Sequence, residues 1–274
     1  MNSKDKETAE AFATSWNNLP SGSVYNFEQF EEWLSPINQT DVEGKEVLEL
    51  GCGNGSLMFH LPKWNPARIE GVDLGESVLS CEKNMKLSGF QNFKITKFDL
   101  TRFESDGFDV VYCIGVLHHL KDPVEGFKSV LKNTKPGGKF HCWVYAEEGN
   151  RVVIRLVDPL RKLASKLPWW TTKYLIATPL VIPYYFYAKL VSKSSVFKKF
   201  PLYEYSRWIA RRECSFFRHV AFDQLVTPQT AYISKETIGN WLNESEEIQE
   251  NSAYIVFRNG NSWKFGGVKK TDKD

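Results

Sequence analysis

The stretch VLELGCGNGSL, residues 47–57, decides how the first half of this chain folds. A short apolar run ends in an acid and then passes into three glycines at alternate positions. An apolar run of this length that stops at glycine indicates a buried strand followed by a tight turn. Because glycine carries no Cβ atom, a ligand can approach the backbone closely there. The stretch therefore predicts a buried strand whose carboxyl end forms part of a binding site.

The same pattern recurs along the chain. Apolar runs predict strands over residues 45–50, 68–74, 92–100, 108–115 and 138–145, with helices over 55–63, 76–88 and 122–133 between them. Strands that alternate with helices of this length favour a parallel, doubly wound α/β sheet. A capped helix over 234–244 follows, and then two strands joined through Asn259-Gly260, a typical hairpin sequence. We therefore predict a mostly parallel, seven-stranded sheet that an antiparallel hairpin closes.

Charge and proline set one segment apart. The 274 residues carry a net charge of +2, yet residues 151–218 contain 14 Lys/Arg against 3 Asp/Glu. The same region is rich in aromatic residues and is interrupted by several prolines, which predicts a break from the α/β pattern. We predict a helical lid over 1–40, a core over 41–150, a basic helical insertion over 151–230, and the closing helix and hairpin over 231–274.

The cysteines and the first residues indicate a compartment. The five cysteines show no C-x-x-C pair and no metal-ligand spacing, and several fall within predicted strands. They are typical of buried apolar side chains in a reducing environment, and no metal site is predicted. The opening residues MNSKDKETAE are charged and lack an apolar core, so no signal peptide is predicted. We expect a cytoplasmic protein.

Candidate ligand groups follow the predicted strands. Asp73 and Asp99 end the second and third strands, and Ile114-Gly115 follow the fourth. The carboxyl ends of parallel strands meet at one edge of a sheet, where ligands bind. A carboxylate about 20 residues after a glycine turn can accept both ribose hydroxyls, and a second can accept from the exocyclic amine of adenine. Each feature alone is more often structural, but together they predict a nucleoside site.

The glycine spacing distinguishes between nucleoside cofactors. The dinucleotide fingerprint G-x-G-x-x-G would place its third glycine at position 56, where this chain has Ser56. A nicotinamide dinucleotide is therefore disfavoured. The motifs VLELGCGNGSL, GVDLGES, KFDL, FDVVYCIGVLHHLKDP and LKNTKPGGKF resemble, in order and spacing, those of class I S-adenosylmethionine-dependent methyltransferases. The resemblance covers residues 40–145, and ETAEAFATSWNNL is similar to the N-terminal segment that lies over the cofactor in bacterial small-molecule methyltransferases.

The resemblance implies an activity, a cofactor and a set of site residues. It implies methyl transfer from S-adenosylmethionine, with the glycines around the amino-acid part, Asp73 at the ribose and Asp99 at the adenine. The implied cofactor residues are Tyr25, Glu49, Gly51, Gly53, Gly55, Asp73, Leu74, Asp99, Leu100, Ile114 and Gly115.

The methyl group of this cofactor is already activated, so alignment can supply much of the catalysis. An O–H or N–H acceptor also needs a base, and His118 and His119 of LHHL are candidates because histidine titrates near neutral pH. The alternative is that one of these rings only packs or caps. Asp223, Gln224 and Tyr232 are candidates for the acceptor pocket.

The insertion leaves several interpretations open. Residues 174–188 form an uncharged stretch of 15 residues with two prolines, shorter than the roughly 20 residues of a spanning helix, so no transmembrane helix is predicted. The segment suits a peripheral membrane contact, a lid over a hydrophobic acceptor, a homo-oligomer contact or an ordinary helical cap. The Arg-aromatic mixture of residues 207–219 also permits an RNA acceptor. We favour a small, moderately hydrophobic or lipid-like acceptor methylated on O, N or C; RNA methylation or an inactive, cofactor-binding partner subunit are the alternatives.

Overall fold

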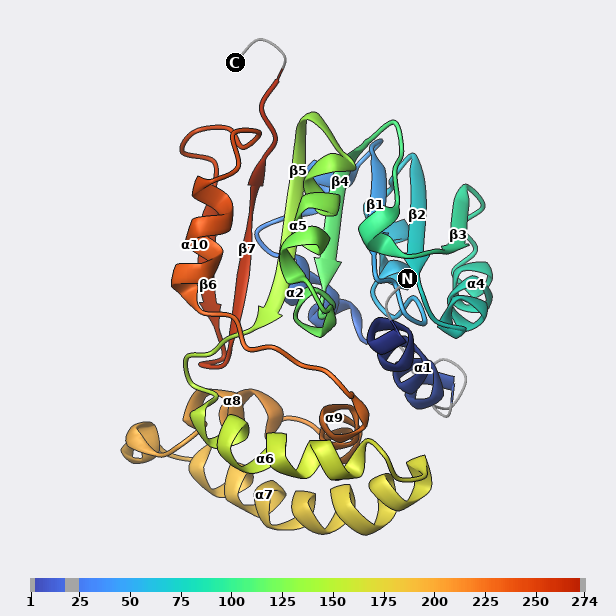
Figure 1. Ribbon diagram of the computed structural model, residues 1–274. Helices are drawn as coiled ribbons and strands as arrows, with labels where there is room; N and C mark the ends of the chain where they lie inside the picture. Colours follow the sequence, from blue (N-terminus) through green and yellow to red (C-terminus); the bar gives the residue numbers. More distant parts are fainter. Residues whose placement is uncertain (1–2, 18–24, 272–274) are drawn as a thin grey trace.

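A computed structural model describes residues 3–17 and 25–271 and shows a single seven-stranded sheet with helices on both faces (Figure 1). The strand order is β3-β2-β1-β4-β5-β7-β6; strands β1 to β5 are parallel, and β7 runs antiparallel to both β5 and β6. The predicted fold class is confirmed. The strands are β1 (Glu46–Leu50), β2 (Arg68–Asp73), β3 (Phe93–Lys97), β4 (Phe108–Ile114), β5 (Thr134–Tyr145), β6 (Tyr254–Arg258) and β7 (Ser262–Val268).

Two layers of helices cover the sheet. The core on one face packs strand side chains against α5 (Pro123–Lys132) and α10 (Lys235–Asn243). The core on the other face packs them against α2 (Phe27–Leu34), η1 (Met58–Trp64) and α4 (Ser77–Leu87). Helix α1 (Ser3–Asn17) and the short α3 (Gln39–Val42) complete the N-terminal part. The three-layer arrangement buries the apolar runs that predicted the strands.

Capping residues explain where two predicted helices begin. Asp122 accepts hydrogen bonds from the first-turn amides of α5, where Pro123 occupies a first-turn position that needs no N–H group. Ser234 accepts from the Thr237 amide at the start of α10. The hairpin turn also forms as predicted, since Asn259 and Gly260 both have positive φ, at 51° and 68°.

Some boundaries differ from prediction. The helix expected over 55–63 is instead a 3-10 segment, η1, which contains Pro62; proline removes an amide donor and disfavours a regular α-helix. The strand expected to reach residue 100 ends at Lys97, and Asp99 instead caps the short turn η2 (Leu100–Arg102). Strand β5 begins at Thr134, earlier than the expected 138, because Thr134 pairs with Phe108 before an irregularity in the register.

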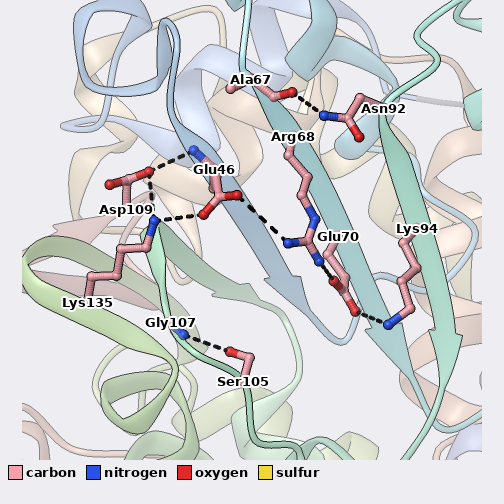
Figure 2. A network of polar contacts seen from close by, with 10 residues as sticks. All are labelled: Glu46, Ala67, Arg68, Glu70, Asn92, Lys94, Ser105, Gly107, Asp109 and Lys135. Carbon is pink, nitrogen blue, oxygen red and sulfur yellow. Dashed lines mark hydrogen bonds and ion pairs between the residues drawn. The ribbon is translucent and has the colours of Figure 1, made fainter.

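Ion pairs tie the amino ends of the strands together (Figure 2). Lys135 Nζ lies 2.7 Å from Glu46 Oε2 and 3.5 Å from Asp109 Oδ2, which joins β5, β1 and β4. The side chain of Glu70 on β2 is almost fully buried and pairs with Arg68 and with Lys94, whose Nζ lies 3.1 Å away. These polar contacts lie at the edge of the sheet opposite the predicted ligand edge.

A helical cap lies below the carboxyl edge of the sheet (Figure 1). Its two cores are formed where α6 and α9 meet, and where α7, α8 and α9 meet. Glu32 of α2 connects the cap to the sheet: its carboxylate accepts from Trp208 Nε1 of α8 and pairs with Arg258 of β6. The cap elements are α6 (Arg151–Ala164), η4 (Thr171–Ala177), α7 (Thr178–Val191), η5 (Ser195–Lys199), α8 (Tyr203–Ile209) and α9 (Cys214–Val226).

Pro168 and Pro201 lie between helices, as the sequence suggests, but three other prolines of the cap do not interrupt it. Pro159 lies inside α6, and Pro179 and Pro183 lie inside α7. The wide π-turns of η4 precede α7 directly, so residues 171–191 form one helical run of 21 residues. Pro179 occupies a first-turn position of α7, and the wider π-turns before it relieve the loss of a regular i→i−4 bond.

Candidate functional site: two adjoining cavities at the carboxyl edge

A cavity of about 210 Å³ lies at the carboxyl ends of β1, β2 and β4, with α1 forming one wall through Asp5, Thr8 and Ala9. The predicted cofactor residues come together there, and Gly55 alone among them does not line the cavity. The lining residues from that set are Tyr25, Glu49, Gly51, Gly53, Asp73, Leu74, Asp99, Leu100, Ile114 and Gly115.

The three glycines after β1 serve different purposes. All have positive φ, which disfavours any residue with a Cβ atom. A Cβ on Gly51 would lie 2.3 Å from Val116 Cγ2, and one on Gly55 would lie 2.7 Å from Cys81 Sγ of α4. A Cβ on Gly53 would meet nothing within 4 Å. Gly51 and Gly55 are therefore required by the packing of the protein itself, and Gly53 is the one whose missing side chain leaves open space in the cavity wall.

Asp73 fixes the glycine loop from the end of β2. Its Oδ2 accepts from the Gly53 amide at 2.9 Å, and its Oδ1 accepts from the Gly75 amide at 2.8 Å. Removal from water raises the pKa of Asp73, and the Gly75 and Gly53 amides oppose that rise by stabilising the carboxylate. The Ser77 hydroxyl also donates to Oδ1, at 3.2 Å. A carboxylate has about four acceptor positions, so a ligand hydroxyl at Asp73 must use the remaining position or displace Ser77.

Glu49 places a second carboxyl group beside the loop. It is 3% exposed, and its Oε2 accepts from the Tyr112 hydroxyl at 2.8 Å. Burial raises the pKa of Glu49 to about 8, with a smaller contribution from Asp73, and the Tyr112 hydrogen bond opposes the rise. Near neutral pH this carboxyl group can take or release a proton in response to a nearby charge.

Asp99 also lines the cavity. Its Oδ1 accepts from the Thr101 amide at 3.0 Å and from the Thr101 hydroxyl at 2.7 Å, which fixes the carboxylate next to Leu100. Gly115 follows β4 with a φ of 78°. Acidic side chains thus share the cavity lining with apolar ones.

Comparisons with known proteins agree with this geometry. Residues 41–155 match the family described as "Methyltransferase domain". The tRNA U34 carboxymethyltransferase of Desulfotalea psychrophila is 32% identical over 101 residues, which covers 36% of this chain and 32% of that protein. A ubiquinone biosynthesis O-methyltransferase of Coxiella burnetii is 30% identical over 132 residues, which covers 43% of this chain and 55% of that protein. The chain thus spans less than two thirds of the length of these relatives.

Solved structures extend the likeness of the fold to nearly the whole chain. Magnesium protoporphyrin IX methyltransferase (ChlM) from Synechocystis PCC 6803 with bound SAH superposes with a TM-score of 0.56 at 13% identity, and covers 97% of this chain and 100% of that chain. The N-methyltransferase NodS from Bradyrhizobium japonicum WM9, in complex with S-adenosyl-L-homocysteine, gives 0.53 at 12% identity over 95% and 99%. Residues 41–155 thus match a methyltransferase domain, and nearly the whole chain shares the fold of these S-adenosylhomocysteine-binding methyltransferases.

The neighbour ChlM is known with bound SAH and with bound SAM, and the residues of the cavity described here fit such a cofactor. Asp73 and Asp99 both line the cavity and offer acceptors of the kind that ribose hydroxyls and the adenine amine require. Glu49 offers a carboxylate beside the glycine loop, where a cationic group can be neutralised. Gly53 leaves the space through which the ligand can approach the backbone. We would assign these four residues to cofactor binding.

A second cavity of about 430 Å³, here called the cap cavity, adjoins the first, here called the cofactor cavity. The cap cavity lies between the sheet edge and the cap and is enclosed mainly by aliphatic and aromatic side chains of α6, α7, α8 and α9. Its polar lining includes the candidates Asp223, Gln224 and Tyr232, together with His219 and Arg258. Both cavities are lined by Tyr25, Trp33, Trp143, Tyr145 and Asp223, which therefore form a shared wall.

The two tryptophans of the shared wall are stacked and held in place. The rings of Trp33 and Trp143 lie 5.4 Å apart with their planes 10° from parallel. His141 accepts from the Tyr254 hydroxyl through Nδ1 and donates from Nε2 to the Trp33 carbonyl oxygen at 2.9 Å. Among the described residues, neither indole Nε1 has a hydrogen-bond partner. The wall thus contains two N–H donors that the rest of the described chain does not satisfy.

His119 lines the cofactor cavity, and His118 packs behind it. His119 Nδ1 lies 3.0 Å from the Gln229 carbonyl oxygen, and burial lowers its pKa to about 3. His118 is fully buried, its ring lies 4.2 Å from that of Tyr145, and burial also lowers its pKa well below the ordinary value. Both rings are therefore neutral at physiological pH.

One polar pair on the acceptor side was missed by sequence reasoning. His219 Nε2 lies 3.2 Å from Asp223 Oδ2, one turn apart on α9, and both side chains are less than a fifth exposed. His219 lines the cap cavity, while Asp223 belongs to the shared wall. The spacing of HVAFD (219–223) is a possible signal, since i and i+4 share a helix face. Which cavity that face borders depends on how α9 packs.

Proposed function

We propose that this protein transfers the methyl group of S-adenosylmethionine to an O, N or C atom of a small, largely apolar acceptor bound in the cap cavity. The observation that carries the proposal is the shared wall: Tyr25, Trp33, Trp143, Tyr145 and Asp223 border both cavities. When bound, the cofactor supplies a carbon activated for displacement. The protein must then align the acceptor atom with that carbon and exclude water, and adjoining cavities suit that alignment.

The lining of the cap cavity supports an apolar acceptor. A volume of about 430 Å³ falls within the usual range for small-molecule sites. Its walls include buried or half-buried side chains such as Val181, Ile209 and Phe217, whose contact with water an apolar ligand would replace. The few polar groups are concentrated near the shared wall, where they can orient the reacting end of the acceptor.

One buried network shapes the polar end of the cavity. Arg161 of α6 donates to the Gln224 carbonyl oxygen at 2.6 Å and to its side-chain oxygen at 2.9 Å, and also to the Tyr232 hydroxyl at 3.2 Å. Arg161 Nη1 pairs with Asp158 at 2.7 Å. This network holds Gln224 and Tyr232 in fixed positions against the acceptor.

For an acceptor that must lose a proton, we infer that the His219–Asp223 pair supplies the base. Asp223 lies at the shared wall and can orient the imidazole, as a carboxylate does for a catalytic histidine. His119 was the candidate from the sequence, but a pKa of about 3 makes it a weak proton acceptor near neutral pH. It remains the rival assignment, because it lines the cofactor cavity.

Calorimetric titration with S-adenosylmethionine and S-adenosylhomocysteine tests the cofactor half of the proposal. We expect micromolar binding to the wild type and a loss of at least about 100-fold in affinity for Asp73→Ala, because the carboxylate orders the glycine loop as well as meeting the ligand. The exposed Asp106→Ala is the matched control and should bind as the wild type does. A protein freed of co-purified cofactor that binds neither compound would contradict the proposal.

The acceptor half is tested by product formation from S-adenosylmethionine. A phenol, a catechol, an amine and a carboxylic acid, each with and without a long alkyl chain, form a suitable panel. We expect the alkylated member of the active pair to have the lower KM. His219→Gln should then lower kcat by about 10²–10⁴-fold at unchanged cofactor affinity, whereas the same loss in His119→Gln alone would reassign the base.

RNA is the second candidate acceptor, favoured by the basic excess over residues 151–218 and by the partial likeness to a tRNA-modifying enzyme. It predicts methylation of total tRNA whose KM rises steeply with salt, since RNA binding releases counterions. The apolar proposal predicts no labelling of tRNA. An inactive partner subunit would bind cofactor yet turn over neither class of acceptor.

The cysteines support our proposal of a reducing, cytoplasmic compartment. All five are free thiols, and Cys52, Cys81, Cys113 and Cys142 are buried. A secreted protein would normally use such residues in disulfides.

A further inference from the structure

The outer side of the cap exposes apolar side chains in two stripes at helical spacing. The stripe on α6 consists of Val152, Leu156, Pro159 and Leu163; the stripe on α7 consists of Pro179, Ile182, Phe186 and Leu190, beside which Leu180 and Pro183 are also exposed. Leu156 is 68% exposed and Phe186 is 67% exposed. Each set follows the spacing of three or four residues that places side chains on one helix face. We call these two stripes, with the exposed residues of η4, the outer face.

The helical run through residues 171–191 is apolar on both of its sides. It is long and apolar enough by length and composition to cross a membrane, with a mean hydropathy of 1.2 in its most apolar window, of which 22% is buried. Its inner side packs Val181, Ala188 and Val191 into the cap. Those inner contacts hold it against α8 and α9, so the run presents its other side outward as a surface helix does. Exposed apolar faces of this kind mark interaction surfaces.

Charges beside the stripes indicate the partner. Arg151, Arg155 and Lys162 are exposed on α6 at the same helical spacing, next to its apolar stripe, and the exposed Lys166 follows the end of the helix. The surrounding segment holds 14 basic residues and 3 acidic ones. A second copy of this face would bring like charges together, whereas an anionic lipid surface complements both the basic rim and the apolar stripes.

Aromatic side chains occur where a bilayer interface would meet the cap. Trp170, which directly precedes η4, is 52% exposed, and Tyr174 within η4 is 48% exposed. Tryptophan and tyrosine favour the headgroup level of a bilayer because they join an apolar ring to a polar group. Aliphatic stripes, by contrast, offer nucleic acid bases little to stack on.

The outer face is continuous with the wall of the cap cavity. Val152 and Leu156 of α6 and Leu180 of α7 are exposed and also line that cavity. We propose that the outer face docks on the surface of an anionic lipid bilayer, and that the acceptor enters the cavity from the bilayer between α6 and α7. The docking proposal depends only on the outer face of the cap, whereas the entry route also depends on the proposed function.

Flotation with lipid vesicles tests the docking without requiring catalysis. The full chain is mixed with vesicles of phosphatidylcholine alone, or of phosphatidylcholine and phosphatidylglycerol in equal amounts. We expect it to float with the anionic vesicles, and Ile182→Gln/Phe186→Gln to partition at least about tenfold less because two apolar anchors are lost. Lys162→Gln/Lys166→Gln should lower partitioning by about fivefold per residue on anionic vesicles only.

Two controls keep the test specific. Leu79→Gln/Leu87→Gln changes two leucines of α4 that are 65% and 64% exposed, and should float as the wild type does. Unchanged calorimetric affinity for S-adenosylmethionine shows that each variant is folded. Absence of wild-type flotation, or equal loss in the α4 control, overturns the proposal; a dimer that Ile182→Gln/Phe186→Gln dissociates, without flotation, would assign the face to a second copy instead.

The entry route has a separate readout. If the acceptor reaches the cavity from the bilayer, anionic vesicles that carry the alkylated acceptor should lower its KM for the wild type and leave the KM of Ile182→Gln/Phe186→Gln unchanged. An equal vesicle effect on both proteins would overturn the entry route while leaving the docking intact. A protein that floats but methylates nothing would contradict the proposed function alone.

Discussion

The sheet domain and the cap bury similar side chains to different extents. In β1, Val47, Leu48 and Leu50 are fully buried, and the charged residues at the amino ends of the strands are paired with one another (Figure 2). In α6 and α7, leucines and a phenylalanine of equal hydrophobicity lie more than half exposed. The central strands of the sheet thus bury or pair their side chains internally, while the cap leaves apolar surface for the acceptor and for a partner. We expect the cofactor side to be rigid and the acceptor side to be adaptable.

The largest expected effect is on the rigid side. Gly51→Ala should lower the free energy of unfolding by about 3 kcal/mol, since it adds a positive φ penalty to an overlap with Val116. Gly44 also has positive φ but open space around its Cβ position, so Gly44→Ala should cost only about 1 kcal/mol. Urea unfolding of both variants measures the difference. Equal costs would mean that the loop after β1 relaxes around the added methyl group and is not rigid.

A somewhat smaller effect tests whether the cap is a separate unit of stability. Arg161→Met removes a buried guanidinium that joins α6 to α9 and to Tyr232, and should destabilise the cap by about 2 kcal/mol or more. Hydrogen exchange should accelerate in α6 and α9 while the amides of β1 and β4 keep their protection. Uniform acceleration across both regions would show that cap and sheet unfold together.

The pH dependence of stability isolates one group of the cofactor cavity. Burial raises the pKa of Glu49 from its ordinary value of 4.5 to about 8, so the folded chain keeps a proton that the unfolded chain has already lost. The free energy of unfolding should therefore fall by more than about 1 kcal/mol between pH 5 and pH 8, relative to Glu49→Gln. If the free energy of unfolding depended on pH in the same way in both proteins, Glu49 would be more exposed to solvent than the structure shows.

The smallest effect concerns the amino edge. Lys94 is largely exposed, but its partner Glu70 is almost fully buried, so Lys94→Ala should cost about 1 kcal/mol. Lys86→Ala removes an exposed i,i+4 pair with Glu82 and should cost no more than about 0.5 kcal/mol. Salt should reduce the second cost more than the first. If salt instead reduced the cost of Lys94→Ala more, the Lys94–Glu70 pair would be no better shielded from solvent than the Lys86–Glu82 pair.

Much of the sheet domain could be predicted because its signals are local. An apolar run that ends in an acid places Asp73 and Asp99 at one edge of the sheet, and Asn259-Gly260 specifies its own turn. The packing role of Gly51 and Gly55 could not be predicted from the neighbouring sequence, since Val116 and Cys81 come from distant parts of the chain. The sequence suggests a glycine loop shaped by the cofactor; the structure shows that internal packing also requires it.

The cap could be predicted as basic and helical, but not in its arrangement. Pro179 suggests a break in the sequence, whereas the π-turns of η4 and its first-turn position in α7 accommodate it. The His219–Asp223 pair has a readable spacing, yet its position beside Tyr145 depends on the packing of α9 under the sheet. Long-range contacts of this kind leave no periodic signal in the sequence.

The shared wall has a consequence for how the two ligands affect each other. A ligand in one cavity that fixes Trp33, Trp143 or Tyr145 changes the surface offered to the ligand in the other. By thermodynamic linkage, any factor by which cofactor tightens acceptor binding must equal the factor by which acceptor tightens cofactor binding. The proposed function places the methyl group of the cofactor at this wall. If it lies there, loss of the methyl group would couple the exchange of product for fresh cofactor to the release of the methylated acceptor.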